Sequence, residues 1–203
     1  GLTGCDGDDG SDGTAGVDGV DGINGTDGAD GITNLVPAGL KRLATAPLGA
    51  EFTGMYLNAD NTFFLNVQHP SDTNVTTDAD GKVFNKGTVG VIVGQDFSAL
   101  PMDFGALDLP ITTTEKEVVM TAVGSYQVLA QQSDTALDGN AMGDILAADG
   151  TTPIKSSNDP DFNGVISDGG TGYYVYTNWE DRPGSMGRVH VDNLTGTGYG
   201  TVT

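Results

Sequence analysis

The stretch "NTFFLNVQ" (61–68) decides the fold class, because bulky apolar and β-branched side chains follow one another over the length of a strand. Further runs rich in Val, Phe, Tyr and Thr share this character: 87–95, 117–132, 172–179 and 187–193. Turn sequences such as Asp80-Gly81 and Asp149-Gly150 separate them. Only residues 139–149 carry helical spacing, and that segment is short. The sequence therefore predicts an all-β domain of antiparallel strands with one helical turn.

Residues 1–31 have a different composition from the rest of the chain. Glycine stands at every third position from Gly1 to Gly31, eight aspartates fill the spaces between, and Lys, Arg, Pro and aromatic residues are missing. Gly-x-y spacing is the requirement of the collagen triple helix, in which only glycine fits at the axis. Such a segment cannot bury a core of its own. The chain is thus expected to divide into an extended collagen-like (polyproline II) arm, 1–31, and a β domain, 32–203.

An ordered arm of this kind requires neighbours. Glycine at every third position lets extended backbones approach closely, and Val17, Val20 and Ile23 form a short apolar strip. We therefore expect the arm to drive association into a homo-oligomer or polymer, with a passive stalk as the alternative. The residues expected to make this contact are Gly16, Val17, Gly19, Val20, Gly22, Ile23 and Gly25.

The charge of the chain limits its partners. A formal net charge of −20, from 28 acids and 8 bases, disfavours nucleic acid and anionic membrane surfaces and favours divalent cations. The segment Leu2-Thr3-Gly4-Cys5 resembles the lipobox of bacterial lipoproteins. That resemblance implies lipidation of Cys5 and an extracellular or outer cell-surface location on a bacterium, with the lipid as the only link to a membrane. The alternative is a free thiol within the repeat.

Carboxylates dominate the candidate metal ligands of the β domain. Two histidines and one cysteine are a poor supply for a tetrahedral zinc site, whereas carboxylate oxygens suit calcium. "DADG" (78–81) resembles a piece of a calcium loop, but a distal glutamate is missing and a hairpin turn is favoured. His69 is expected to be a hydrogen-bonded structural residue. The candidate ligands are Glu51, Asp60, Asp72, Asp78, Asp80, Asp134, Asp159, Asp161, Glu180 and Asp181.

Two long stretches resemble the PhoX-type alkaline phosphatases, a family of calcium-dependent β-propeller phosphatases. In residues 47–72 the matching positions are Gly49, Ala50, Glu51, Thr53, Gly54, Asn66, Val67, Gln68, His69 and Pro70. The second stretch runs from 124–134 through 158–192, where Asn178 and Glu180 match and Trp179 stands in place of the usual histidine. Together they span about residues 38–195, the N-terminal portion of such a protein.

The resemblance implies antiparallel sheets forming part of a β-propeller, with Glu51 and Glu180 as calcium ligands. The iron-binding cysteine of the family has no counterpart in the β domain, so iron is expected only in a longer chain. A blade takes about 40–50 residues, so residues 38–203 supply about three blades. The chain is then either a piece of a longer protein or a short relative that associates with further copies.

Three functions remain open. The first is an extracellular, filament- or surface-forming structural subunit with a calcium-binding β domain, assembling through its arm. The second is part of a calcium-dependent phosphomonoesterase displayed as a surface lipoprotein, in which case we expect this chain alone to be inactive. The third is a cation-binding surface lipoprotein without chemistry.

Overall fold

The computed structural model describes residues 40–59, 61–192 and 201–202. The chain divides into two units, Gly1–Leu35 and Val36–Thr203, and all described residues lie in the second. Cys5, the predicted arm and its predicted contact residues 16–25 therefore lie outside the described residues, as does Asp60.

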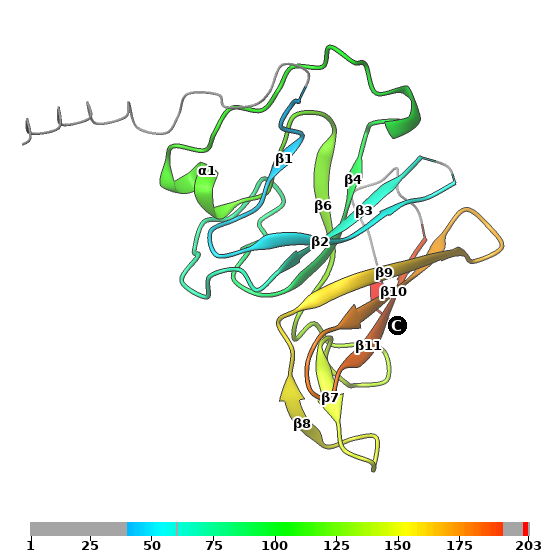
Figure 1. Cartoon of the computed structure of the whole chain (residues 1–203). Helices are drawn as coiled ribbons and strands as arrows, with labels where there is room; N and C mark the ends of the chain where they lie inside the picture. The colour runs from blue at the N-terminus through cyan, green and yellow to red at the C-terminus, as the bar shows by residue number, and fades with distance from the viewer. Residues whose placement is uncertain (1–39, 60, 193–200, 203) are drawn as a thin grey trace, which may run out of the picture. The chain divides into compact units, whose positions relative to one another are not determined.

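Two four-stranded antiparallel sheets form the body of the β domain (Figure 1). The first sheet has the order β2-β3-β4-β6 and consists of Glu51–Leu57, Phe63–Gln68, Thr88–Val93 and Ser125–Gln131. The second has the order β12-β11-β10-β9, and β9 to β12 span Pro160–Ser167, Tyr173–Trp179, Ser185–Val191 and Thr201–Val202. This confirms the predicted all-β class with antiparallel strands.

Two short antiparallel pairs extend this body. In the first, β1 (Ala44–Thr45) pairs with β5 (Met120–Thr121). In the second, β7 (Asp144–Leu146) pairs with β8 (Pro153–Ser156). The described residues also contain a 3-10 turn, η1 (Phe97–Ala99), and one helical turn, α1 (Thr113–Glu117). Neither helix in this part of the chain is long and apolar enough to cross a bilayer.

The predicted helical segment 139–149 is wrong. It contains β7, and its backbone turns at Gly139 and Gly143, whose φ angles of 88° and 83° lie in the left-handed region. The helix is instead α1, which begins at a capping box: the Thr112 side chain accepts from Glu115 N, and the Glu115 carboxylate accepts from Thr112 N.

The main core lies between the two sheets, which pack face to face. Trp179, Phe64 and Val175 are each fully buried there. Alternate residues of β10 and β11 point toward this core, as the period of a strand requires. The remaining buried members of the cluster are Val89, Val91, Leu129, Ala130, Met142, Val165, Val189 and Val191.

A second core covers the other face of the first sheet. Leu65, Val67 and Ile92 on that face pack with Phe84 and Tyr126. Half-buried apolar residues from the loop that carries η1 and α1, including Phe97, Val118 and Val119, complete the cluster. Burial on both faces explains why β3 and β4 carry apolar residues on both sides instead of alternating strictly with polar ones.

Candidate metal centre

The two predicted calcium ligands line one hollow of about 630 Å³. Glu51 is the first residue of β2 and pairs with Gln68 at the end of β3. Glu180 directly follows β10. The hollow therefore lies where strands of the two sheets begin and end. Its full lining is Glu51, Gln68, His69, Lys155, Asp159, Glu180, Asp181 and Arg182.

Glu51 contacts His69 on one side of the hollow. The Nε2 atom of His69 lies 3.1 Å from Oε1 of Glu51, and its Nδ1 atom donates to the Gly49 carbonyl at 2.9 Å. Partial burial lowers the pKa of His69, but hydrogen bonds to Gly49 and Glu51 outweigh it, so the pKa lies above its ordinary value. His69 is thus the hydrogen-bonded residue expected from the sequence.

Backbone hydrogen bonds hold Glu180 beside Asp159. The Glu180 amide donates to the Asp159 carbonyl at 2.7 Å, and the Glu180 carbonyl accepts from Oγ of Ser157 at 2.7 Å. Its carboxylate lies 3.4 Å from Nε2 of Gln68, which belongs to the first sheet. The main chain of Glu180 is therefore fixed, while its side chain is exposed to solvent.

The Asp159 carboxyl has a raised pKa, first because it is partly buried. Nearby Glu180 and Asp181 raise it further, although His69 and Lys155 act in the opposite direction. Asp181 itself is paired with Lys155, whose Nζ lies 2.5 Å from its Oδ1, and this bond lowers the pKa of Asp181. Burial and repulsion by neighbouring carboxylates therefore destabilise the ionised form of Asp159.

The carboxylate oxygens that line this hollow are suitable ligands for a hard cation such as calcium. They are not grouped around a single point, however. Within residues 40–59, 61–192 and 201–202, no group of three or more His, Cys, Asp or Glu side chains has a geometry that could hold a metal ion. Glu51, Glu180 and Asp181 each contact another side chain instead. Of the other predicted ligands, Asp72, Asp78, Asp80, Asp134 and Asp161 do not line this hollow.

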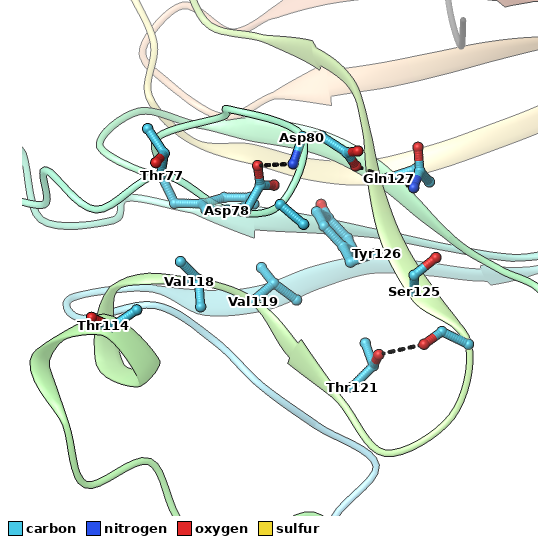
Figure 2. Close-up of a pocket in the computed structure, with 13 residues that line it drawn as sticks. Thr77, Asp78, Asp80, Thr114, Val118, Val119, Thr121, Ser125, Tyr126 and Gln127 are labelled. Carbon is cyan, nitrogen blue, oxygen red and sulfur yellow. Dashed lines mark hydrogen bonds between the residues drawn. The ribbon is translucent and has the colours of Figure 1, made fainter. Parts of the chain in front are cut away.

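The "DADG" segment forms a hairpin turn. Oδ1 of Asp78 accepts from the amides of Asp80 and Lys82 at 2.9 and 2.7 Å, and Thr77 bridges to Val83 across the turn. This confirms the hairpin interpretation. The turn borders a second hollow of about 490 Å³, which Val118, Val119 and Tyr126 also line (Figure 2).

Several residues that carry the PhoX resemblance join the two sheets. Oγ1 of Thr53 donates to the Pro160 carbonyl at 2.6 Å. Gly54 has a φ of 58°, and a side chain there would overlap the Asn66 amide. Trp179, in the position where histidine is usual in that family, is fully buried in the main core. Thr53, Gly54 and Trp179 therefore each contribute to the contact between the two sheets.

Lys155 and Arg182 line the hollow, but the sequence did not predict them as site residues. Lys155 lies in β8, a strand of four exposed residues without a strand-like pattern. Arg182 stands two residues after Glu180, which is the only sequence signal for its place. Comparison of the chain with family models, curated proteins and solved structures gave no match.

Proposed function

We propose that the chain is an extracellular structural subunit that assembles through its arm and binds calcium in the hollow at Glu51 and Glu180. The proposed calcium site is supported by one observation: the carboxylates of Glu51, Asp159 and Glu180 line a single hollow. Burial first, and then repulsion by Glu180 and Asp181, raise the pKa of Asp159, and a divalent cation there would offset both.

Calcium accepts six to eight oxygen ligands in flexible geometry, so exposed side chains can gather around it. Glu51 would exchange its contact with His69, and Glu180 its contact with Gln68, for the cation. The positive charges of Lys155 and Arg182 repel a cation in the same hollow. We therefore expect an affinity in the range of about 10⁻⁴–10⁻³ M that is typical of extracellular calcium modules.

The fold is compatible with a partial β-propeller of PhoX type. Each large sheet is a set of antiparallel neighbours, and the two pack face to face, as adjacent propeller blades do. In that arrangement the hollow at the strand ends would face the centre of the propeller. Location on a bacterial surface, with Cys5 as a lipid anchor, completes the proposal.

Calorimetric titration with calcium chloride tests the metal site. We expect binding by the full chain and a loss of at least tenfold in affinity for Glu51→Gln and Glu180→Gln. Asp108→Asn is a matched control, because it removes one charge from an exposed position outside the hollow. Equal affinity in both glutamine variants and the control would exclude this site.

A separate measurement tests the assembly. Deleting residues 1–31, or introducing Gly19→Val with Gly22→Val, should leave a folded chain that no longer associates. Static light scattering and negative-stain electron microscopy report mass and shape directly. Particles of unchanged size after the deletion would show that the arm is a passive stalk.

A second candidate is that the chain is part of a longer calcium-dependent phosphomonoesterase and supplies part of its active site. Lys155 and Arg182 line the same hollow as the carboxylates, and such cations can contact phosphate oxygens beside a bound metal ion.

A further inference from the structure

A histidine stands between two carboxylates at one end of the second sheet. Nε2 of His190, in β11, lies 3.0 Å from Oδ2 of Asp168, which directly follows β9. Nδ1 of the same ring lies 3.2 Å from Oδ1 of Asp192, which directly follows β11. The ring therefore joins the turn between β9 and β10 to the end of β11.

Asp168 is held in place by its own turn. Its Oδ1 accepts from the amides of Gly170 and Gly172 at 2.8 and 3.1 Å, and its amide donates to the Gly172 carbonyl at 3.1 Å. The side chains of Asp168 and His190 are 18% and 22% exposed, whereas the side chain of Asp192 is 72% exposed. The contact with Asp168 is thus sheltered, and the contact with Asp192 lies at the surface.

The two contacts of His190 require a proton on each ring nitrogen. A neutral imidazole has one N–H group and one lone pair, so it donates to one carboxylate and directs its lone pair at the other. The imidazolium ion presents an N–H group to both carboxylates and carries the opposite charge. A histidine with ordinary surroundings changes between these two forms from about pH 5 to pH 8.

The other groups around the ring are compatible with a positive charge. Tyr174, on the neighbouring strand β10, stacks on His190 with the ring centres 4.6 Å apart, and the face of an aromatic ring attracts a cation. Arg188, two residues earlier in β11, contributes a like charge, and its guanidinium lies 5.0 Å from the centre of the Tyr174 ring. Ile166 and Thr201, which complete the row of paired residues from β9 to β12, are uncharged.

We propose that His190 is a pH-sensitive clamp, which holds Asp168 and Asp192 together while both ring nitrogens are protonated and releases Asp192 when one proton is lost. Asp192 is the partner released, because Asp168 is less exposed and its other oxygen is fixed by the turn. The clamp lies before β10, whereas Glu180 follows β10. This inference is therefore independent of the proposed calcium site and of assembly.

Strong acid should open the clamp from the other side. Hydrogen bonds from His190 first, and then from the Gly170 amide, lower the pKa of Asp168 below its ordinary value of 3.8. A depressed carboxyl pKa gives stability that is present above the unfolded-state pKa and is lost as pH falls through the folded-state pKa. The clamp is therefore closed in mild acid, up to the range in which His190 loses a proton, and open in alkali.

Amide hydrogen exchange followed by mass spectrometry tests the clamp in the full chain. Exchange rates at about pH 5.5 and about pH 8.5 are each divided by the intrinsic rate at that pH, which gives the protection of residues 168–172 and 188–192. The turn at Asp149 is an internal reference, because its carboxylate accepts from the amides of Thr151 and Thr152. The variants are His190→Gln and Asp192→Asn, and His69→Gln is the control that removes the other histidine.

We expect the protection of both segments in the native chain to fall about fivefold or more between the lower and the higher pH, while residues 149–152 stay within about twofold. His190→Gln should abolish this fall. Asp192→Asn should abolish it too, because a side-chain amide can donate to the lone pair of the neutral ring. His69→Gln should behave as the native chain does. A native chain without the fall, or a fall that persists in His190→Gln or in Asp192→Asn, would overturn the inference.

Discussion

Asn66 and Asn163 form a reciprocal amide pair that joins the two sheets inside the β domain. Nδ2 of Asn163 donates to Oδ1 of Asn66 at 2.8 Å, and Nδ2 of Asn66 donates to Oδ1 of Asn163 at 3.2 Å. Both side chains are fully buried. Asn163 also donates to the Gly54 carbonyl and accepts from Thr177, at 3.0 and 2.7 Å. A buried amide of this kind is stable only while its partners remain.

Asn66→Ala should therefore destabilise the domain by about 1–3 kcal/mol, because it leaves polar atoms of Asn163 without their partner. Urea unfolding followed by tryptophan fluorescence measures this, since Trp179 is buried in the adjoining core. Asn178→Ala is the control, because Asn178 lies on the outer face of the second sheet, away from the pair. A loss of stability no greater than that of the control would contradict a structural role for the pair.

Two glycines in strands should respond differently to alanine. A side chain at Gly90 in β4 would overlap the Tyr126 ring and lie 2.8 Å from the Gln127 carbonyl oxygen. Tyr126 has little room to move, because its hydroxyl donates to the Leu65 carbonyl at 3.1 Å inside the second core. Gly90→Ala should cost about 1–3 kcal/mol of unfolding free energy. Gly164→Ala on the open face of β9, where nothing lies within 4 Å, should be close to neutral.

The sequence predicted strands well wherever burial is continuous. The runs 61–68 and 87–95 contain β3 and β4, which are covered on both faces, and 172–179 contains β10. It missed β9, because Asp161, Asn163 and Gly164 are poor strand formers and their positions are stabilised by pairing with β10. It also missed the Thr112–Glu115 capping box, which is visible in the sequence.

For the candidate site, the sequence identified residues but not their surroundings. Glu51 and Glu180 were expected to bind one metal cluster on the basis of resemblance, and both line one hollow. Nothing in their spacing indicates that Lys155 lies there too, because its place depends on the pairing of β8 with β7 and on its contact with Asp181. The contacts of Glu51 with His69 and of Glu180 with Gln68 likewise depend on tertiary structure.

Acid should release the carboxylate that joins α1 to the loop between β3 and β4. Oε2 of Glu117 accepts from the hydroxyl of Thr76 at 2.6 Å and from the amides of Thr76 and Val75 at 2.9 and 3.0 Å. These bonds, the Thr76 hydroxyl first, lower the pKa of Glu117 below its ordinary value of 4.5. A depressed carboxyl pKa contributes stability above the unfolded-state pKa, and this contribution is lost as pH falls through the folded-state pKa.

Glu117→Gln should accordingly reduce the urea midpoint at neutral pH, and the difference from the native chain should shrink as pH falls below 4.5. The exposed Asp108→Asn serves as the control for loss of one negative charge. A difference between Glu117→Gln and the native chain that stays constant from neutral to acidic pH would exclude the carboxylate as its origin.

We predict that this chain alone does not hydrolyse phosphomonoesters appreciably. In metal-assisted phosphoryl transfer the ions must contact the transferring group directly and stabilise its charge. The hollow at Glu51 and Glu180 offers carboxylates that are not gathered around one point, and Lys155 is engaged by Asp181. The measurement is release of a chromogenic alcohol from its phosphate ester, with calcium and iron salts added. Glu51→Gln, which keeps the size of the side chain and removes its charge, sets the background. Turnover by the native chain at least tenfold above that background would show that the hollow is already a working active site.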